Sequence, residues 1–261
     1  MMADVLSLRD RVIAVTGGAR GIGLAITQGL VALDAAVVML GRDSETLAAR
    51  SKELGDRAIP CQCDVASPES VNAAFAVIEK RFGLLDGLIN NAAVGWPHRI
   101  EEITDGELIT EVGTNLVGPI LTTRAAVPLL RRSRDPHIIN ISSESSHDPF
   151  PYLVLYAATK SALETLTAGL HHELWEDGIR VTLLRVGQTQ GGGFRLGWEP
   201  ERRAQAEQAW QDLGFKARVA GGAVGQSVER VAEAVAYVLS QPAGSVVDVL
   251  NVRAHSGRLP T

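Results

Sequence analysis

Tyr156 and Lys160 lie four residues apart, and Ser143 lies thirteen residues before the tyrosine. Positions i and i+4 share one face of a helix, so a helix here places the phenol beside the ammonium. Because an ammonium favours the ionised form of a neighbouring phenol, we expect Lys160 to lower the pKa of Tyr156 from its usual value of about 10. Ser143 ends an apolar, strand-like run and could bring a hydroxyl to the same place. Together the three residues predict acid/base chemistry near neutral pH.

A glycine-rich turn, Thr16–Gly23, follows the first apolar run and opens a helical pattern. Its glycines, Gly17, Gly21 and Gly23, have the spacing G-x-x-x-G-x-G. Glycine permits a tight turn and a close approach of a pyrophosphate to the backbone, and the N-terminus of the next helix offers N–H groups to the anion. The turn therefore predicts a dinucleotide site. A tight strand-to-helix turn without a ligand is the alternative.

The residues after the second apolar run bear on which dinucleotide is bound. An acidic residue at the tip of this strand would bind the ribose hydroxyls and repel a 2′-phosphate. Gly41 occupies the tip, and Arg42 follows it. An arginine fork matches a phosphate, and Arg20 in the glycine turn could reach the same group. The sequence therefore favours NADP, while NAD stays possible if Asp43 rather than Gly41 faces the ribose.

Composition excludes several classes of partner. The 261-residue chain carries a formal net charge of −5, and an acidic chain suits neither nucleic acid nor an anionic membrane. No stretch approaches the roughly 20 apolar residues that span a bilayer, and residues 1–10 are too polar for a signal peptide. Cys61 and Cys63 are best explained as reduced core thiols without a metal. These features predict a cytoplasmic protein.

Strand-length apolar runs alternate with helical patterns along the chain. The expected strands are 11–16, 36–40, 58–63, 85–90, 137–142, 179–186 and 245–252. The expected helices are 21–33, 44–54, 68–81, 105–130, 152–175 and 227–239. Such alternation predicts an α/β fold, a doubly wound Rossmann fold with about seven parallel strands and helices on both faces. No linker marks a second domain, so residues 1–261 are expected to form one domain.

A long irregular insert, 187–225, follows the sixth expected strand. A doubly wound fold places its ligand-covering loops after the carboxyl ends of strands, so we expect this insert to cover a substrate. Trp96 and Phe194 are expected to form an apolar wall, suited to an alicyclic, aromatic or medium-chain carbonyl compound. Glu144 and Tyr152 are expected to line the same pocket.

These motifs occur in the order and spacing of a known family. The chain resembles the short-chain dehydrogenase/reductase (SDR) family, of the NADP-preferring type, over nearly its whole length. The matching segments are Thr16–Gly23, Asp64-Val65, Asn90–Ala93, Asn115, Ser143 and Tyr156-x-x-x-Lys160. Each motif alone is modest, but their order and their placement on the alternating strands and helices distinguish the resemblance from chance.

The resemblance implies four catalytic residues. Tyr156 would be the general acid in reduction, or the base in oxidation, and Ser143 would hydrogen-bond and orient the substrate oxygen. Lys160 would bind the nicotinamide ribose and lower the pKa of Tyr156. Asn115 would hold a water that links Lys160 to solvent. This division agrees with the chemistry, because hydride transfer to a carbonyl needs donors aimed at the developing alkoxide.

The resemblance also implies a set of cofactor-binding residues. Asp64 and Val65 would contact the adenine, and Asn91 with its neighbours would line the ribose. The full expected set is Gly17, Arg20, Gly21, Ile22, Gly23, Arg42, Asp64, Val65, Asn91, Ala92, Ala93, Tyr156, Lys160, Gly187 and Thr189. No metal site is expected.

Three departures from the family pattern stand out. Ala93 replaces a frequent glycine and brings a methyl group toward the cofactor wall. Val186-Gly187 replaces the usual Pro-Gly, and Gly191 stands where a threonine often follows, while Gly187 and Thr189 keep the positions whose backbone usually meets the nicotinamide carboxamide. The tail 246–253 lacks the Asp-Gly-Gly ending of ketoacyl-reductase-like members and resembles that of NADP-dependent hydroxy-acid and aldehyde/ketone reductases.

We therefore expect an NADP-dependent oxidoreductase that interconverts a ketone or aldehyde with an alcohol. The alternatives are an NAD-dependent alcohol dehydrogenase, a catalytically silent nucleotide-binding relative, and a sugar-nucleotide epimerase or dehydratase. The presence of all four catalytic residues disfavours the silent relative, and the short insert disfavours the last. Family members are commonly homodimers or homotetramers, built through the helices expected here at about 105–130 and 152–176.

Overall fold

Seven strands form one parallel sheet in the order β3-β2-β1-β4-β5-β6-β9. The computed structural model describes residues 8–215 and 225–254. The strands are β1 (Val12–Thr16), β2 (Ala36–Gly41), β3 (Ala58–Gln62), β4 (Gly87–Asn90), β5 (His137–Ser143), β6 (Arg180–Val186) and β9 (Val249–Val252). The chain winds outward from β1 to β3, returns to β4 beside β1, and then winds outward in the other direction. The expected doubly wound Rossmann fold is confirmed.

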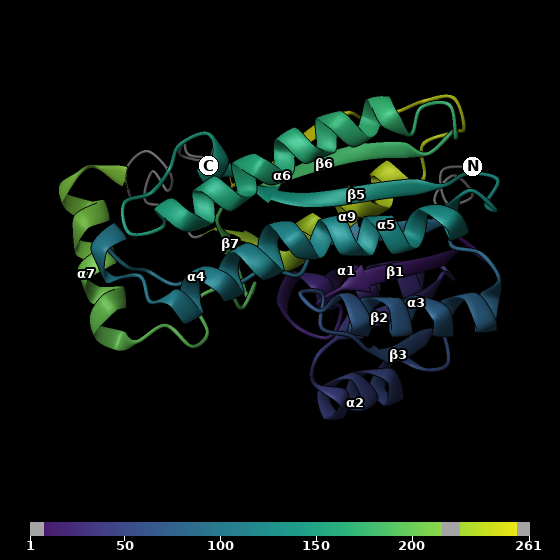
Figure 1. Ribbon diagram of the computed structural model, residues 1–261, viewed down its shortest axis with the longest axis horizontal. Helices are drawn as coiled ribbons and strands as arrows, with labels where there is room; N and C mark the ends of the chain where they lie inside the picture. Colours follow the sequence, from purple (N-terminus) through teal and green to yellow (C-terminus); the bar gives the residue numbers. More distant parts are fainter. Residues whose placement is uncertain (1–7, 216–224, 255–261) are drawn as a thin grey trace, which may run out of the picture.

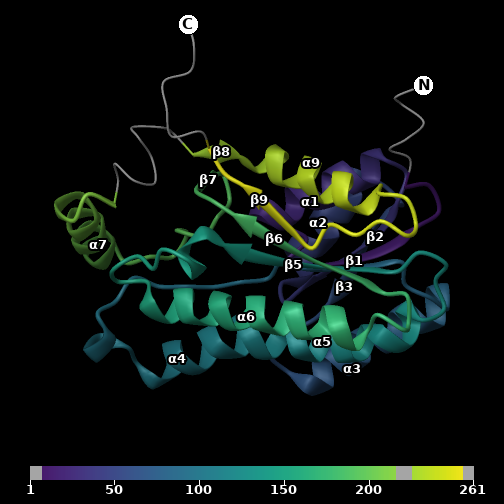
Figure 2. The same ribbon diagram turned by 90° about the horizontal axis from the view of Figure 1, so that it is seen from above.

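Helices cover both faces of this sheet (Figures 1 and 2). In Figure 2, α1 and α9 lie side by side above the sheet, and α3, α5 and α6 lie below it. The helices are α1 (Gly21–Ala32), α2 (Ser44–Leu54), α3 (Pro68–Phe82), α4 (Asp105–Val112), α5 (Gly118–Leu130), α6 (Val154–Glu173), α7 (Pro200–Asp212) and α9 (Val228–Leu239). Helix α7 lies at one end of the molecule, away from the sheet (Figure 1).

The central strands of the sheet are buried on both faces, and this explains why they are continuous apolar runs, whereas the edge strand β9 is partly exposed. All five residues of β1 are buried. On one face, Ile26 of α1 and Val235 of α9 belong to the same core cluster. On the other face, Phe75 of α3 and Leu121 of α5 belong to a second cluster. Burial of this apolar surface, at about 25 cal/mol per Å², is the main force that holds the helices on the sheet.

Strand order reverses between β1 and β4, and ligands of such folds bind beyond the carboxyl ends of the strands at this point. A buried amide network stiffens this region. The Asn90 side chain on β4 donates to Asn140 Oδ1 on β5 at 2.9 Å, and Thr122 on α5 donates to Asn90 Oδ1 at 2.7 Å. Buried polar groups that are satisfied in this way fix the relative positions of the elements that carry them.

The helix expected over 105–130 is interrupted. Between α4 and α5 lies a π-helical turn, η3 (Gly113–Val117). The sequence at this point weakens a regular helix, because Gly118 lowers helix propensity and Pro119 has no N–H to donate. Gly118 also packs closely on Val65, whose Cγ2 would lie 2.9 Å from a Cβ at that position. The wider turn is therefore built into the chain, and such π-bulges often lie at functional sites.

The insert 187–225 is more regular than expected. Its first residues form β7 (Thr189–Gln190), which pairs in parallel with β8 (Gln226–Ser227). It also contains α7, which begins with a proline at its first turn. Helix α7 is mostly polar, so apolar periodicity could not predict it. Residues 216–224 of the insert lie outside the described residues.

Candidate active site

The carboxyl end of β5 places Ser143 at the crevice. Its hydroxyl accepts hydrogen bonds from the backbone N–H of Ser145 at 3.3 Å and from the Ser145 hydroxyl at 2.9 Å. The turn that follows is held by Glu164 of α6, which accepts from the Ser146 hydroxyl at 2.5 Å and forms a two-pronged pair with Arg185. Burial opposes ionisation here, but the hydrogen bonds from Arg185 and Ser146 outweigh it and lower the pKa of Glu164 to about 2.

Helix α6 carries Tyr156 to the same place. A hydrogen bond joins its hydroxyl to the side chain of Ser143. Burial raises the pKa of Tyr156 to about 12; the bond to Ser143 lowers it, and the charge of Glu111 raises it further. The expectation that Lys160 lowers this pKa below its usual value is wrong for this structure, because burial outweighs the favourable contacts. Tyr156 is therefore a protonated hydroxyl, a donor, at neutral pH.

Lys160 lies one helical turn after the tyrosine and is almost fully buried. Its ammonium donates to the backbone carbonyl of Ile141 on β5 at 2.8 Å and lies 5.8 Å from the centre of the Tyr156 ring. Burial lowers the pKa of Lys160 to about 8. The same strand thus anchors both the lysine and, two residues later, Ser143.

Asn115 lies in the π-helical turn η3 and is fully buried. Its amide oxygen accepts from the Val94 N–H at 2.9 Å, and its amide nitrogen donates to the Val94 carbonyl at 2.7 Å. The same nitrogen donates to the Thr159 hydroxyl on α6 at 3.1 Å. The structure therefore brings together all four residues expected to be catalytic.

The glycine turn has the geometry of an anion site. Gly17 and Gly21 have φ angles of +66° and +52°, which residues with a side chain rarely adopt. A Cβ on Gly23 would lie 2.1 Å from the Gly17 carbonyl oxygen. At the start of α1, Arg20 occupies the N-cap position and makes no capping hydrogen bond through its side chain. The first N–H groups of the helix are thus free of a side-chain cap and suit a phosphate.

The segment after β4 closes against this turn. The Thr16 hydroxyl accepts from the N–H groups of Asn91 and Ala92, both at 2.9 Å, and the Asn91 side chain donates to the Thr16 carbonyl at 2.8 Å. Asn91 is also within 3.1 Å of a Cβ at Gly17. The expected ribose-lining residues therefore border the glycine turn, with Ala93 as the next residue.

Arg20, Arg42 and Asp43 gather at the end of β2. The Arg20 guanidinium donates to Asp43 Oδ2 at 2.5 Å and to the Thr46 hydroxyl at 2.9 Å. Asp43 caps α2 by accepting from the Thr46 N–H at 3.1 Å, and its hydrogen bonds with Thr46 hold its pKa below the usual value. Within the described chain, no hydrogen bond or ion pair engages the exposed Arg42 side chain. The carboxylate is thus committed to the helix cap, while the neighbouring cation is available.

The remaining expected cofactor residues lie around the same crevice. Asp64 accepts from the Ala66 N–H at 3.0 Å, and Val65 packs against Gly118. Ile22 lies 3.6 Å from a Cβ at Gly192. Thr189 donates to the Gly187 carbonyl at 2.9 Å.

Comparison with known proteins decides the family. A family model described as short chain dehydrogenase matches residues 11–201. The chain belongs to the short-chain dehydrogenase family. It is an NAD(P)-dependent short-chain dehydrogenase/reductase, as the motifs had indicated.

Individual relatives agree over most of their length. An uncharacterized oxidoreductase of Staphylococcus aureus (strain USA300) is 31% identical over 94% of this chain and 98% of its own. Two solved structures are each 26% identical with a TM-score of 0.82, and each match covers 96% of this chain and 99% of the other. One is the closed form of serine dehydrogenase with NADP+, and the other is 3-ketoacyl-(acyl-carrier-protein) reductase from Brucella melitensis with NADH.

The insert of this short-chain dehydrogenase covers Tyr156 with aromatic rings. The Phe194 ring lies 4.6 Å from that of Tyr156, and the Trp198 ring lies 5.4 Å from that of Phe194. The Trp198 indole donates to the Gly95 carbonyl at 2.7 Å. Trp96 and Tyr152 pack at the margin of the same cluster. Trp96 and Phe194, expected to form an apolar wall, thus belong to one aromatic cluster, and the Phe194 ring packs on the Tyr156 ring.

The start of the insert also touches the glycine turn. A Cβ at Gly21 would lie 2.1 Å from the carbonyl oxygen of Gly192. Glu144 joins the insert to β5, because it accepts from the Gln188 N–H at 3.1 Å, and burial raises its pKa. The insert thus bridges the expected cofactor and substrate sides of the crevice.

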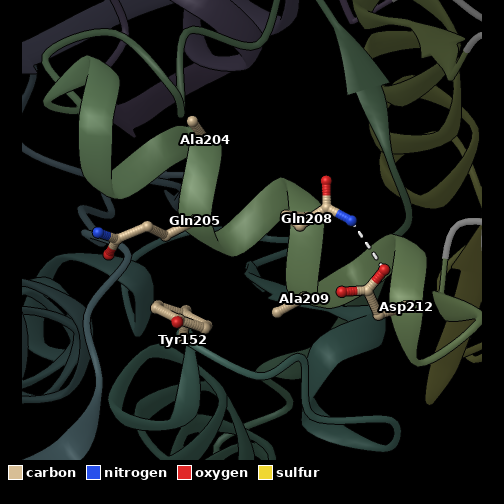
Figure 3. Close-up of a pocket in the computed structure, with 6 residues that line it drawn as sticks. All are labelled: Tyr152, Ala204, Gln205, Gln208, Ala209 and Asp212. Atoms are coloured by element: carbon tan, nitrogen blue, oxygen red, sulfur yellow. Dashed lines mark hydrogen bonds between the residues drawn. The ribbon is translucent and has the colours of Figure 1, made fainter.

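A groove lies between Tyr152 and helix α7 (Figure 3). Its volume is about 540 Å³, and it is lined by Tyr152, Ala204, Gln205, Gln208, Ala209 and Asp212. In Figure 3 the Tyr152 ring lies below α7, which supplies the other lining side chains. Tyr152 has a φ of +68°, which is rare for a residue with a side chain. Tyr152 therefore joins this groove to the aromatic cluster, and its expected place in a substrate pocket stays a prediction.

Sequence reasoning missed Glu111, on the inner face of α4. Its side chain is fully buried, and neither carboxyl oxygen makes a hydrogen bond of good geometry within the described residues. Burial raises the pKa of Glu111 to about 7; the Trp96 N–H lowers it, and the charge of Glu107 raises it. The sequence signal that could have identified Glu111 is its position four residues before Asn115, the spacing of neighbours on a helix face.

No group of histidine, cysteine and acidic side chains among the described residues could hold a metal ion. Within the same residues, no helix has both the length and the apolar character needed to cross a membrane.

Replacement of Glu111 should stabilise the protein, and more so at higher pH. The folded-state pKa of about 7 lies above the ordinary value of 4.5, so wild-type stability falls as pH rises between these values. We expect the difference in unfolding free energy between Glu111→Met and wild type to be about 2 kcal/mol larger at pH 8 than at pH 5. Urea unfolding at both pH values measures this difference.

The exposed Glu101 provides a control, since Glu101→Gln removes a carboxylate that solvent already screens. Its effect on unfolding should be small and the same at both pH values. A Glu111→Met variant whose gain does not change with pH would contradict the assignment of a buried, uncompensated carboxyl.

Proposed function

We propose that this protein is an NADP-dependent oxidoreductase that interconverts a ketone or aldehyde with the corresponding alcohol, with Tyr156 as its acid/base. The observation that carries the proposal is the convergence of Ser143, Tyr156, Lys160 and Asn115 at one end of the sheet. A silent nucleotide-binding relative would have no need of this arrangement. An epimerase or dehydratase is disfavoured by the size of the insert.

The chain's own residues supply the proton chemistry. Tyr156, protonated at neutral pH and hydrogen-bonded to Ser143, would donate its proton to the substrate oxygen as negative charge develops there. Ser143 would orient that oxygen by a second hydrogen bond. In the reverse direction the ionised tyrosine would accept the proton of the alcohol. Lys160 and Asn115, both buried on the same side of α6, would return the proton from solvent.

The glycine turn and the residues around it fit a dinucleotide, which when bound supplies the hydride. The free N–H groups at the start of α1 would bind its pyrophosphate, and Asn91 and Ala92 would border a ribose. Asp64 and Val65 would border the adenine, and Gly187 and Thr189 the nicotinamide amide. Lys160 would bind the second ribose through its ammonium.

Arg42 and Asp43 support NADP over NAD. Asp43 is engaged by its helix cap and by Arg20, so it is a poor partner for ribose hydroxyls, while Arg42 is exposed and available for a 2′-phosphate. The serine dehydrogenase relative contains NADP+ and the ketoacyl reductase contains NADH, so NAD use is the competing proposal. Binding of NAD through Asp43 would require this residue to leave its helix cap, whereas binding of NADP through Arg42 would not.

We propose an apolar carbonyl compound as the substrate. Trp96 and Phe194 would contact its hydrocarbon part, with Glu144 and Tyr152 at the margin. This follows from the aromatic cluster next to Tyr156, which offers a large apolar surface and few polar partners. The free, buried thiols of Cys61 and Cys63 support a cytoplasmic location, and residues 1–261 are proposed to act as one domain.

Replacing Tyr156 by phenylalanine should abolish turnover without loss of nucleotide. Because general acid catalysis contributes about 10²- to 10⁴-fold, we expect kcat to fall by this factor. Binding of NADPH, measured by energy transfer from tryptophan, should change less than about twofold, since the ring remains. Tyr237→Phe, at an exposed residue of α9, is the control and should leave both values unchanged. Substantial activity in Tyr156→Phe would refute the assignment.

Removal of the Arg42 guanidinium should weaken the binding of NADPH but not that of NADH. A charge-assisted pair with a phosphate contributes about 1.5–3 kcal/mol, so Arg42→Ala should weaken NADPH binding roughly 10- to 100-fold and leave NADH binding almost unchanged. Parallel titrations with both dinucleotides measure this. Arg50→Ala, which removes a surface arginine of α2 paired with Glu53, is the matched control. Equal weakening of both dinucleotides would instead favour NAD and a role for Asp43.

The outer helices support a homodimer or homotetramer. Leu108 and Ile109 of α4, Ile120 of α5 and Val154 of α6 are large apolar side chains with 41–70% of their surface exposed. Such a patch is typical of protein–protein contacts. We expect light scattering to give a dimer or tetramer mass, and Ile109→Glu to shift it toward the monomer. A wild-type protein that is monomeric at micromolar concentration would contradict this.

A further inference from the structure

The Glu111 carboxyl is a charged group that the chemistry described above does not use. It lies in the last turn of α4, four residues before Asn115, and α4 packs against α6. It is fully buried, and its two oxygens lack a well-formed hydrogen bond within the described residues. A group of this kind is costly to bury, and its charge acts on neighbours with little screening by water.

Glu111 and Tyr156 share one wall. The backbone N–H of Trp96 lies close enough to the Glu111 carboxyl to favour its charged form. The preceding residue, Gly95, lies against the Tyr156 ring, since a Cβ there would be 2.9 Å from Tyr156 Cδ2. Two consecutive residues of the segment after β4 thus border the carboxyl and the phenol. Across this wall the charge of Glu111 opposes ionisation of Tyr156 and raises the pKa of the phenol.

The other charged groups around this pair do not neutralise Glu111. On its own helix, Glu107 is paired with Arg202 of α7 at 2.7 Å. On α6, the Lys160 ammonium donates to the Ile141 carbonyl. In the segment after β4, the buried His98 has an unpartnered Nε2 within the described residues, and its backbone N–H binds the Tyr152 carbonyl. No arginine or lysine of the described chain forms an ion pair with Glu111.

We propose that Glu111 is a positioning residue for the proton of Tyr156: its carboxylate holds the tyrosine in the proton-donating form and so biases the enzyme toward carbonyl reduction. The bias toward carbonyl reduction rests on the proposed function, whereas the coupling between Glu111 and Tyr156 does not. Repulsion between the two anions opposes loss of the Tyr156 proton, and this keeps the acid present as the pH rises above neutral. Oxidation of an alcohol, which needs the ionised tyrosine, is displaced to higher pH.

The consequence appears in the pH dependence of turnover. In wild type, kcat/KM for carbonyl reduction should fall only at high pH. In Glu111→Gln and Glu111→Met, which both remove the charge, the midpoint of this fall should move down by about one pH unit. Alcohol oxidation below its own midpoint should become about tenfold faster at a fixed pH. Glu101→Gln, an exposed charge removal just before α4, should leave both profiles in place.

A second readout does not require activity. The chain contains three tyrosines, so ring-carbon NMR of protein labelled at tyrosine Cζ gives three resonances, and Tyr156→Phe identifies the one of interest. In wild type the Tyr156 resonance should show a step with its midpoint near pH 7, as Glu111 ionises. This step should be absent from Glu111→Gln and Glu111→Met. The two variants differ in shape, so the test survives if one does not fold.

The outcomes separate this inference from the function proposed above. A step that persists in both variants, or a wild-type resonance without a step, would overturn the coupling even if the enzyme reduces carbonyls. Unshifted pH profiles in the two variants would overturn the bias toward reduction. If the step is present and depends on Glu111 but no carbonyl compound is turned over, the coupling stands and the proposed function fails.

Discussion

The buried contact between Lys160 and the Ile141 carbonyl fixes the geometry of the whole site. A buried ammonium must find a strong acceptor, and here a strand carbonyl provides it at 2.8 Å. This contact sets both the height and the rotation of α6 over β5. Because Tyr156 lies one turn before the lysine and Ser143 lies two residues after Ile141, the two hydroxyls then meet. The pairing of Ser143 with Tyr156 is thus a consequence of how one helix is attached to one strand.

The other elements support that attachment from both sides. The π-helical turn η3 moves Asn115 inward, where its amide bonds the Val94 backbone and Thr159 of α6. Glu164, on the same helix, holds the turn after Ser143 through Ser146 and Arg185. Polar groups buried in this way must be satisfied together, so small displacements of α6 would break several of them at once.

Much of this arrangement could be predicted from the sequence, because it depends on patterns that are local. Buried parallel strands such as β1 are continuous apolar runs, and the glycine turn follows the first of them. Tyr156 and Lys160 share a helix face by spacing alone. The break at η3 and the polar helix α7 could not be found by periodicity, since a wide turn and a polar surface leave little apolar signal. The high pKa of Tyr156 and the buried state of Glu111 depend on tertiary packing, which spacing does not describe.

Gly21 illustrates how closely the parts of this molecule are joined. Its positive φ shapes the glycine turn, and the absence of a side chain lets the Gly192 carbonyl approach from the insert. A substitution at this single position would therefore alter the glycine turn and the insert that covers Tyr156 together. In evolutionary terms the position is pleiotropic. A change in the first residues of the insert would therefore have to be accommodated by the glycine turn, and a change in the turn by the insert.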